Sequence, residues 1–149
     1  MSPSTLEDHL GYWLRLVSNN VSHSFARKVE AQGVTVAEWV FLRALYDHDT
    51  ASPTLLAAQM GMTRGAISKL ADRLIAKALV TRTAHPQDRR AQILSLTTDG
   101  RARVPELARL ADANDDSFFG VLSKDERTAL EAALRKIATL RKLSGPAAD

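Results

Sequence analysis

The chain contains no cysteine, few aromatic residues and no long apolar run. Without cysteine it can form neither disulfides nor thiolate nucleophiles, and it cannot offer thiolates to a metal. No segment approaches the roughly 18–20 consecutive apolar residues that span a bilayer. The acidic N-terminal segment also lacks the hydrophobic stretch of a signal peptide. We therefore expect a cytoplasmic protein without a membrane partner.

The motifs of common enzymes are missing as well. The chain has no G-x-S-x-G, no P-loop, no H-E-x-x-H and no glycine pattern for dinucleotide binding. None of its histidines stands at H-x-x-x-H spacing, so surface or core positions are favoured over a zinc or pH-sensing site. The histidines are His9, His23, His48 and His85. We predict a protein that is not an enzyme and that holds no metal and no cofactor.

Positive charge is concentrated between residues 63 and 103. This segment has three acidic residues and a net charge of +6, whereas the whole chain carries only +3. Its nine basic residues are Arg64, Lys69, Arg73, Lys77, Arg82, Arg89, Arg90, Arg101 and Arg103. Charge concentrated on one structural unit attracts a phosphate backbone, so double-stranded DNA is the expected partner.

Two short helices joined by a glycine turn are predicted at residues 53–60 and 63–78. Pro53 suits a first helical turn, Gly61 supplies the turn and Thr63 caps the second helix. The apolar residues expected to be buried are Leu55, Leu56, Met60, Ile67, Leu70 and Leu74. The residues expected on the opposite, polar face are Arg64, Gly65, Ser68, Lys69, Asp72 and Arg73. This arrangement is typical of a helix-turn-helix, whose second helix enters the major groove of DNA.

A hairpin is predicted after these helices. Residues 80–84 and 91–97 are rich in β-branched side chains, and residues 85–90 between them are polar and contain proline. Two adjacent arginines in this loop could enter a minor groove, whose negative potential favours guanidinium groups. Asp88 is expected to hold the side chain of Arg90 in direction. The alternative is a solvated charged turn without a function.

The predicted DNA contacts are therefore drawn from both units. They are Thr63, Arg64, Gly65, Ser68, Lys69 and Arg73 on the helix, and Arg89 and Arg90 on the hairpin.

Longer helices flank this central unit. Apolar residues at helical spacing predict one helix over residues 5–31, and Thr35 with Glu38 forms a capping box that begins another. Further helices are predicted from residue 98 to about 120 and from Ser123 to 143, followed by a linker-like tail at 144–149. The apolar residues that so small a core cannot wholly cover are Leu107, Leu110, Phe118, Phe119, Leu122, Leu130, Leu134, Ile137 and Leu140. These exposed stripes favour association with a second copy of the chain.

The central motifs resemble the MarR family of winged-helix transcription regulators. The similarity is carried by Asp88-x-Arg90 in the hairpin, by Leu96-Thr97-x-x-Gly100 after it, and by Gly61 to Ser68 at the start of the second short helix. The order of helices around one hairpin matches this family from about Leu6 to Leu143. A helical adaptor that binds another protein would explain the helices, but it would not explain the basic hairpin.

The resemblance implies a mainly α fold with a small β wing, in a single subunit of residues 1–149. The winged helix-turn-helix would span 34–97, and 5–31 with 98–143 would supply dimerisation helices. It implies a homodimeric regulator, more often a repressor, on a pseudo-palindromic operator. It also implies a small aromatic or phenolic effector, for which Trp13, Asn20 and Trp39 are candidates by position. The alternative for both tryptophans is a role as core anchors.

Overall fold

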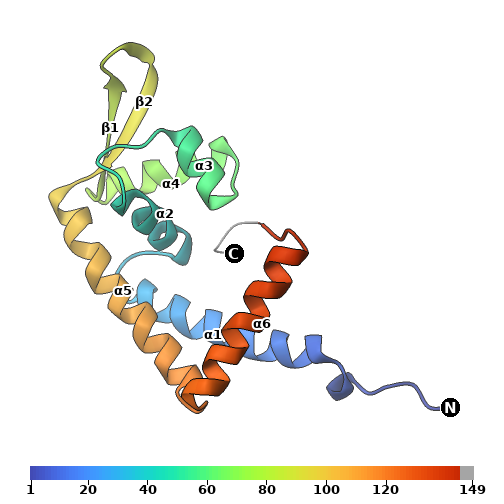
Figure 1. Cartoon of the computed structure of the whole chain (residues 1–149). Helices are drawn as coiled ribbons and strands as arrows, with labels where there is room; N and C mark the ends of the chain where they lie inside the picture. The colour runs from blue at the N-terminus through green and yellow to red at the C-terminus, as the bar shows by residue number, and fades with distance from the viewer. Residues whose placement is uncertain (145–149) are drawn as a thin grey trace.

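The computed structural model describes residues 1–144 and confirms a mainly α fold with a small β wing (Figure 1). The elements in these residues are η1 (Leu6–Asp8), α1 (Leu10–Glu30), α2 (Val36–Tyr46), α3 (Pro53–Met60), α4 (Arg64–Ala76), β1 (Val80–His85), β2 (Asp88–Leu96), α5 (Thr98–Phe119) and α6 (Lys124–Leu140). The predicted tail, apart from residue 144, lies outside the described residues. No helix among residues 1–144 has the length and apolar character needed to cross a membrane.

The predicted capping residues begin their helices. The Thr35 hydroxyl accepts the Glu38 N–H at 3.1 Å, and the Glu38 carboxylate accepts the Thr35 N–H at 2.8 Å. Ser52 and Thr63 each accept a backbone N–H at 3.1 Å at the starts of α3 and α4, and Ser123 forms a second capping box at α6. These side chains satisfy backbone donors that a helix start leaves unpaired, which fixes where each helix begins.

The end of α4 differs from the prediction. The helix was expected to continue to residue 78, but it ends at Ala76, and Ala78 has a left-handed φ of 60°. The Ala78 N–H donates to Ile75 O and the Leu79 N–H donates to Leu74 O, both at 2.9 Å. This is a Schellman motif in which alanine occupies the position usually held by glycine. It reverses the chain sharply and leads it into β1.

One hydrophobic core joins α2, α3, α4, the base of the wing and α5. Its fully buried side chains include Phe41, Leu42, Leu45, Leu56, Ile67, Leu74, Leu94 and Leu107. Two expectations were wrong. Leu55 is 38% exposed, because the buried face of the short α3 is formed by its neighbours Leu56, Ala57 and Met60. Leu107, which was assigned to the uncovered stripes, is buried because α5 packs against α2.

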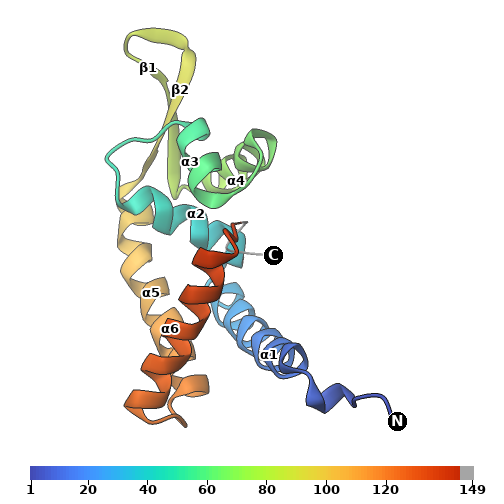
Figure 2. The same cartoon turned by 45° about the vertical axis from the view of Figure 1, so that its right-hand side comes forward.

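The wing projects from this core as a two-stranded antiparallel ribbon (Figures 1 and 2). Its register pairs Val80 with Leu96 and Arg82 with Leu94. At the base, Ala51 and Leu94 exchange two backbone hydrogen bonds of 2.9 and 2.8 Å. The side chains of Val80 and Leu94 are buried there, whereas the far end of the ribbon is exposed. The core thus holds the wing at one end only.

The helices α1, α6 and the second half of α5 extend to the other side of the winged region (Figure 2). None of the residues of α6 is buried, and its apolar stripe is 37–71% exposed at Leu130, Leu134, Ile137 and Leu140. The first half of α1 likewise exposes large apolar side chains, namely Leu10, Trp13, Leu14 and Val17. The single chain therefore leaves apolar faces of two helices uncovered.

Candidate nucleic-acid interface

The exposed face of α4 is polar and basic over its whole length. Ile67, Leu70, Ala71 and Leu74 are buried against the core. The six residues predicted to contact DNA from this segment, Thr63, Arg64, Gly65, Ser68, Lys69 and Arg73, are all at least partly exposed. The 3.6-residue period of the helix places these two sets on opposite faces. The side of α4 that the protein leaves open therefore carries positive charge and small side chains.

The tip of the wing is tighter than predicted. The expected six-residue loop is a two-residue turn at Pro86 and Gln87, and β2 already begins at Asp88. His85 pairs with Asp88 while Ala84 pairs with Gln92, so Arg89, Arg90 and Ala91 have no partner residue on β1. Such an irregularity bends a strand and turns side chains out of the regular alternation. Both arginines are exposed on this bulge.

Asp88 acts on the wing in a different way from the one predicted. Its carboxylate oxygen accepts the backbone N–H of Arg90 at 3.0 Å and forms no ion pair with the Arg90 guanidinium. The turn is also held by the ring of His85, whose Nδ1 accepts the Gln87 N–H at 3.1 Å. Asp88 therefore shapes the backbone that carries Arg90 and leaves the guanidinium free.

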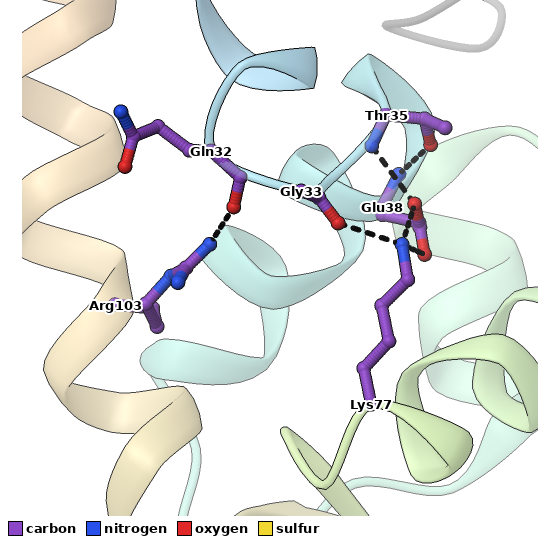
Figure 3. Close-up of polar contacts among 6 residues, drawn as sticks. All are labelled: Gln32, Gly33, Thr35, Glu38, Lys77 and Arg103. Carbon is purple, nitrogen blue, oxygen red and sulfur yellow. Dashed lines mark hydrogen bonds and ion pairs between the residues drawn. The ribbon is translucent and has the colours of Figure 1, made fainter.

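The structure divides the nine basic residues of segment 63–103 into two groups. Four of them are used inside the protein. Lys77 pairs with Glu38, Arg82 pairs with Asp72, Arg101 donates to backbone carbonyls, and Arg103 donates to Gln32 O (Figure 3). The other five form no ion pair within residues 1–144, and they are Arg64, Lys69, Arg73, Arg89 and Arg90. All five are exposed, on α4 or on the wing. The net charge of the segment is thus directed outward at these two elements.

An ion pair links α4 to the wing. The Arg82 guanidinium lies 2.9 Å from the Asp72 carboxylate, and the Arg82 side chain is largely covered. Asp72 was expected on the polar face of α4, but its link to Arg82 could not be recognised from the sequence alone. The pair joins the base of β1 to the middle of α4. It therefore helps to fix the direction of the wing relative to the helix.

A cavity of about 690 Å³ lies between α1, α2 and α5. Phe25, Val36 and Trp39 are among its apolar lining residues, while His23 and Asn114 are among the polar ones. Its volume is in the range of small-molecule sites, about 300–1,000 Å³. Asn114 is buried and is held by Lys28 Nζ at 2.9 Å and by Val21 O at 3.1 Å. A buried amide in an otherwise apolar stripe of α5 was the sequence signal that could have revealed this site.

Of the three ligand candidates, only Trp39 lines the cavity. Trp39 is 9% exposed and belongs to the core, so it serves both as a core anchor and as a cavity wall. Trp13 is 47% exposed and donates its indole N–H to Glu7 O at 2.9 Å, so it is no core anchor in the single chain. Asn20 donates to Leu16 O at 2.7 Å within α1. Neither Trp13 nor Asn20 is among the lining residues.

Comparison with known proteins gives consistent matches. The model described as MarR family matches residues 32–91. A candidate regulatory protein for the hcr operon of Thauera aromatica is 31% identical over 137 residues, which cover 89% of this chain and 81% of that protein. BpsR of Bordetella bronchiseptica, solved to explain regulation of its DNA binding by 6-hydroxynicotinic acid, has a TM-score of 0.78 at 29% identity, covering 92% and 98% of the two chains. A mutant MarR of Escherichia coli complexed with operator DNA has a TM-score of 0.76 at 25% identity, covering 86% and 92%.

Proposed function

This chain belongs to the MarR family of transcription regulators, and on that premise we propose how it acts. It binds a pseudo-palindromic operator as a homodimer in the cytoplasm, represses transcription, and changes its DNA affinity when a small aromatic molecule binds. The winged helix-turn-helix is formed by residues 34–97. The dimerisation helices are formed by residues 5–31 and 98–143. The one observation that carries the proposal is the set of five exposed basic residues on α4 and the wing that have no ion pair within residues 1–144.

In this proposal α4 lies in the major groove. Arg64 and Lys69 reach base edges, and the small side chains of Gly65 and Ser68 allow the helix to approach them. Thr63 donates from the helix start to a phosphate oxygen. Arg73, one turn after Lys69, follows the backbone of the duplex.

The wing lies on the neighbouring minor groove. Arg89 and Arg90 extend from the bulge at its tip, where guanidinium groups meet the negative potential of a narrow groove. The short turn and the Asp88 hydrogen bond keep the tip compact. The Asp72–Arg82 pair supports the angle at which the wing leaves α4.

The uncovered faces of α1 and α6 support a homodimer. Both expose large apolar side chains along one stripe, and both stand on the side of the molecule away from the wing (Figures 1 and 2). A second copy of the chain would cover these stripes and place two α4 helices one turn of DNA apart, roughly 34–36 Å. A dimer over two successive major-groove faces excludes other proteins from the same stretch of DNA, which favours repression.

The cavity between α1, α2 and α5 supports an effector site. Trp39 and Phe25 supply aromatic walls, and Asn114 and His23 supply polar groups that could orient a ring substituent. The site lies where dimerisation helices meet the winged region, so an occupant would act on the relative position of the two parts. The BpsR precedent makes 6-hydroxynicotinic acid a suitable first probe.

The DNA proposal is tested by selecting bound fragments from random duplexes and measuring their affinity against salt concentration. With five exposed basic groups on each protomer, a dimer should give a slope of log K against log salt of about −5 or steeper. A slope near zero, or binding without sequence preference, would refute a sequence-specific regulator. Sedimentation at micromolar concentration tests the dimer, and a monomer there would refute it.

The effector proposal is tested on the selected fragment with 6-hydroxynicotinic acid and a panel of aromatic acids and phenols. Release of DNA together with a change in tryptophan fluorescence supports it. An unchanged affinity with every compound, at concentrations up to solubility, would refute it. Trp39→Phe should abolish the fluorescence response while the change in DNA affinity persists.

A further inference from the structure

Lys77 joins three segments of the protein through one ammonium group. Its Nζ donates to both carboxylate oxygens of Glu38 at 2.9 Å and to Gly33 O at 2.8 Å (Figure 3). Lys77 directly follows the last residue of α4, Glu38 lies in the first turn of α2, and Gly33 lies in the turn between α1 and α2. A lysine has three donors, and these contacts use all of them. Lys77 is therefore engaged within the protein although it extends the DNA-facing helix.

The Glu38 carboxylate holds this lysine in a fixed place. Its side chain is 1% exposed, and one of its oxygens also accepts the Thr35 N–H. Burial raises the pKa of the Glu38 carboxyl, but hydrogen bonds from Lys77 and Thr35 and the charge of Lys77 together outweigh it and keep the pKa below the ordinary value. A buried charge that loses its partner is strongly destabilised. The end of α4 therefore cannot turn away from α2 without a large cost.

The turn between α1 and α2 is also held from its other side. Arg103 on α5 donates to Gln32 O, which precedes the carbonyl of Gly33 that accepts from Lys77. Figure 3 shows the two basic side chains approaching the turn from different elements. The dimerisation helices α1 and α5 thus meet the end of α4 at two adjacent backbone carbonyls. These contacts connect the orientation of α4 to the helices that would form the dimer.

We propose that Lys77 is a positioning residue that sets the spacing of the two α4 helices in the dimer and makes no contact with DNA. This inference rests on the proposed binding of a homodimer to two half-sites. A dimer with firmly held helices accepts one half-site spacing, because an added base pair shifts the second half-site by about 3.4 Å and rotates it. Loosening the Lys77–Glu38 contact reduces that discrimination.

The test uses two variants with opposite changes of charge, Lys77→Met and Glu38→Gln. Glutamine at position 38 keeps the capping box with Thr35, so the start of α2 is preserved. Binding is measured to the selected operator and to the same operator lengthened by one central base pair. Both variants should lower the preference for the native spacing by about threefold or more, while the salt slope stays that of the wild type. Altered stability alone would leave this ratio unchanged in the folded fraction.

Lys69→Met is the matched control, because it removes the same charge from the exposed face of the same helix. It should weaken both operators alike and make the salt slope shallower by about 0.9 for each phosphate that Lys69 neutralises in the wild type. If Lys77→Met behaves like this control while Glu38→Gln binds both operators as the wild type does, Lys77 contacts phosphate and the inference is wrong. If Lys77→Met does not fold, the result for Glu38→Gln decides. A wild type that shows no spacing preference would instead refute the proposed two-half-site function.

Discussion

Replacing Gly100 with alanine should destabilise the protein strongly, because the site has no room for a methyl group. Gly100 is buried in the first turn of α5, and a Cβ built on it would lie 2.0 Å from Leu79 O and 3.0 Å from Leu79 C. Leu79 O is itself held, because it accepts the Thr97 N–H at 3.1 Å. Relief requires a movement of at least about 1 Å, a backbone adjustment of the kind that overpacking costs at about 3 kcal/mol.

The expected effect is a fall of the melting temperature by roughly 6–12 °C, using about 2–4 °C per kcal/mol for a chain of this size. Thermal unfolding followed by circular dichroism measures it, at one protomer concentration because association shifts the midpoint. Gly65→Ala is the matched control. Its nearest neighbour would be Thr63 Oγ1 at 4.0 Å, and alanine favours a helix by up to about 1 kcal/mol. An unchanged or raised midpoint for Gly100→Ala would refute the steric reasoning.

Three other positions provide further tests. Ala78→Gly should stabilise the protein by about 1 kcal/mol, because glycine adopts the left-handed φ of 60° without the Cβ penalty; chemical denaturation measures it, and a loss of stability would contradict it. The lowered pKa of Glu38 means that its charged form stabilises the fold above the ordinary pKa of 4.5 and that this contribution is lost as the pH falls through the lower folded value. The stability difference between wild type and Glu38→Gln should therefore shrink on acidification below about pH 4.5, and a difference that grows there would be incompatible with this assignment. Arg90→Ala should weaken operator binding about tenfold or more with an unchanged melting temperature, and equal affinity for both proteins would remove the wing from the interface.

The sequence predicted the features that depend on neighbouring residues. Capping at Thr35, Ser52, Thr63 and Ser123 depends on bonds to residues three positions away, so the helix starts were placed correctly. The exposed face of α4 followed from the helical period. The early end of α4 was missed, because a left-handed alanine at position 78 carries no sequence signal of the kind that glycine gives.

The features that depend on distant partners could not be predicted. Lys77 and Arg82 looked like parts of the basic surface, and only the fold brings them to Glu38 and Asp72. The bulge at the wing tip depends on the register between β1 and β2, which the strand pattern alone leaves open. The cavity combines residues of three helices, so position along α1 wrongly suggested Trp13 and Asn20 as its walls.

The wing is anchored at its base, where Ala51 bonds to Leu94, and is exposed at its tip. A ribbon of this kind behaves as a cantilever, in which the same thermal force displaces the free end furthest. Amide protons should accordingly exchange with solvent in a gradient, slowly beside Leu94 and Val80 and fastest at the turn. The arginines at that free end could then follow grooves of slightly different width with little effect on the packed core.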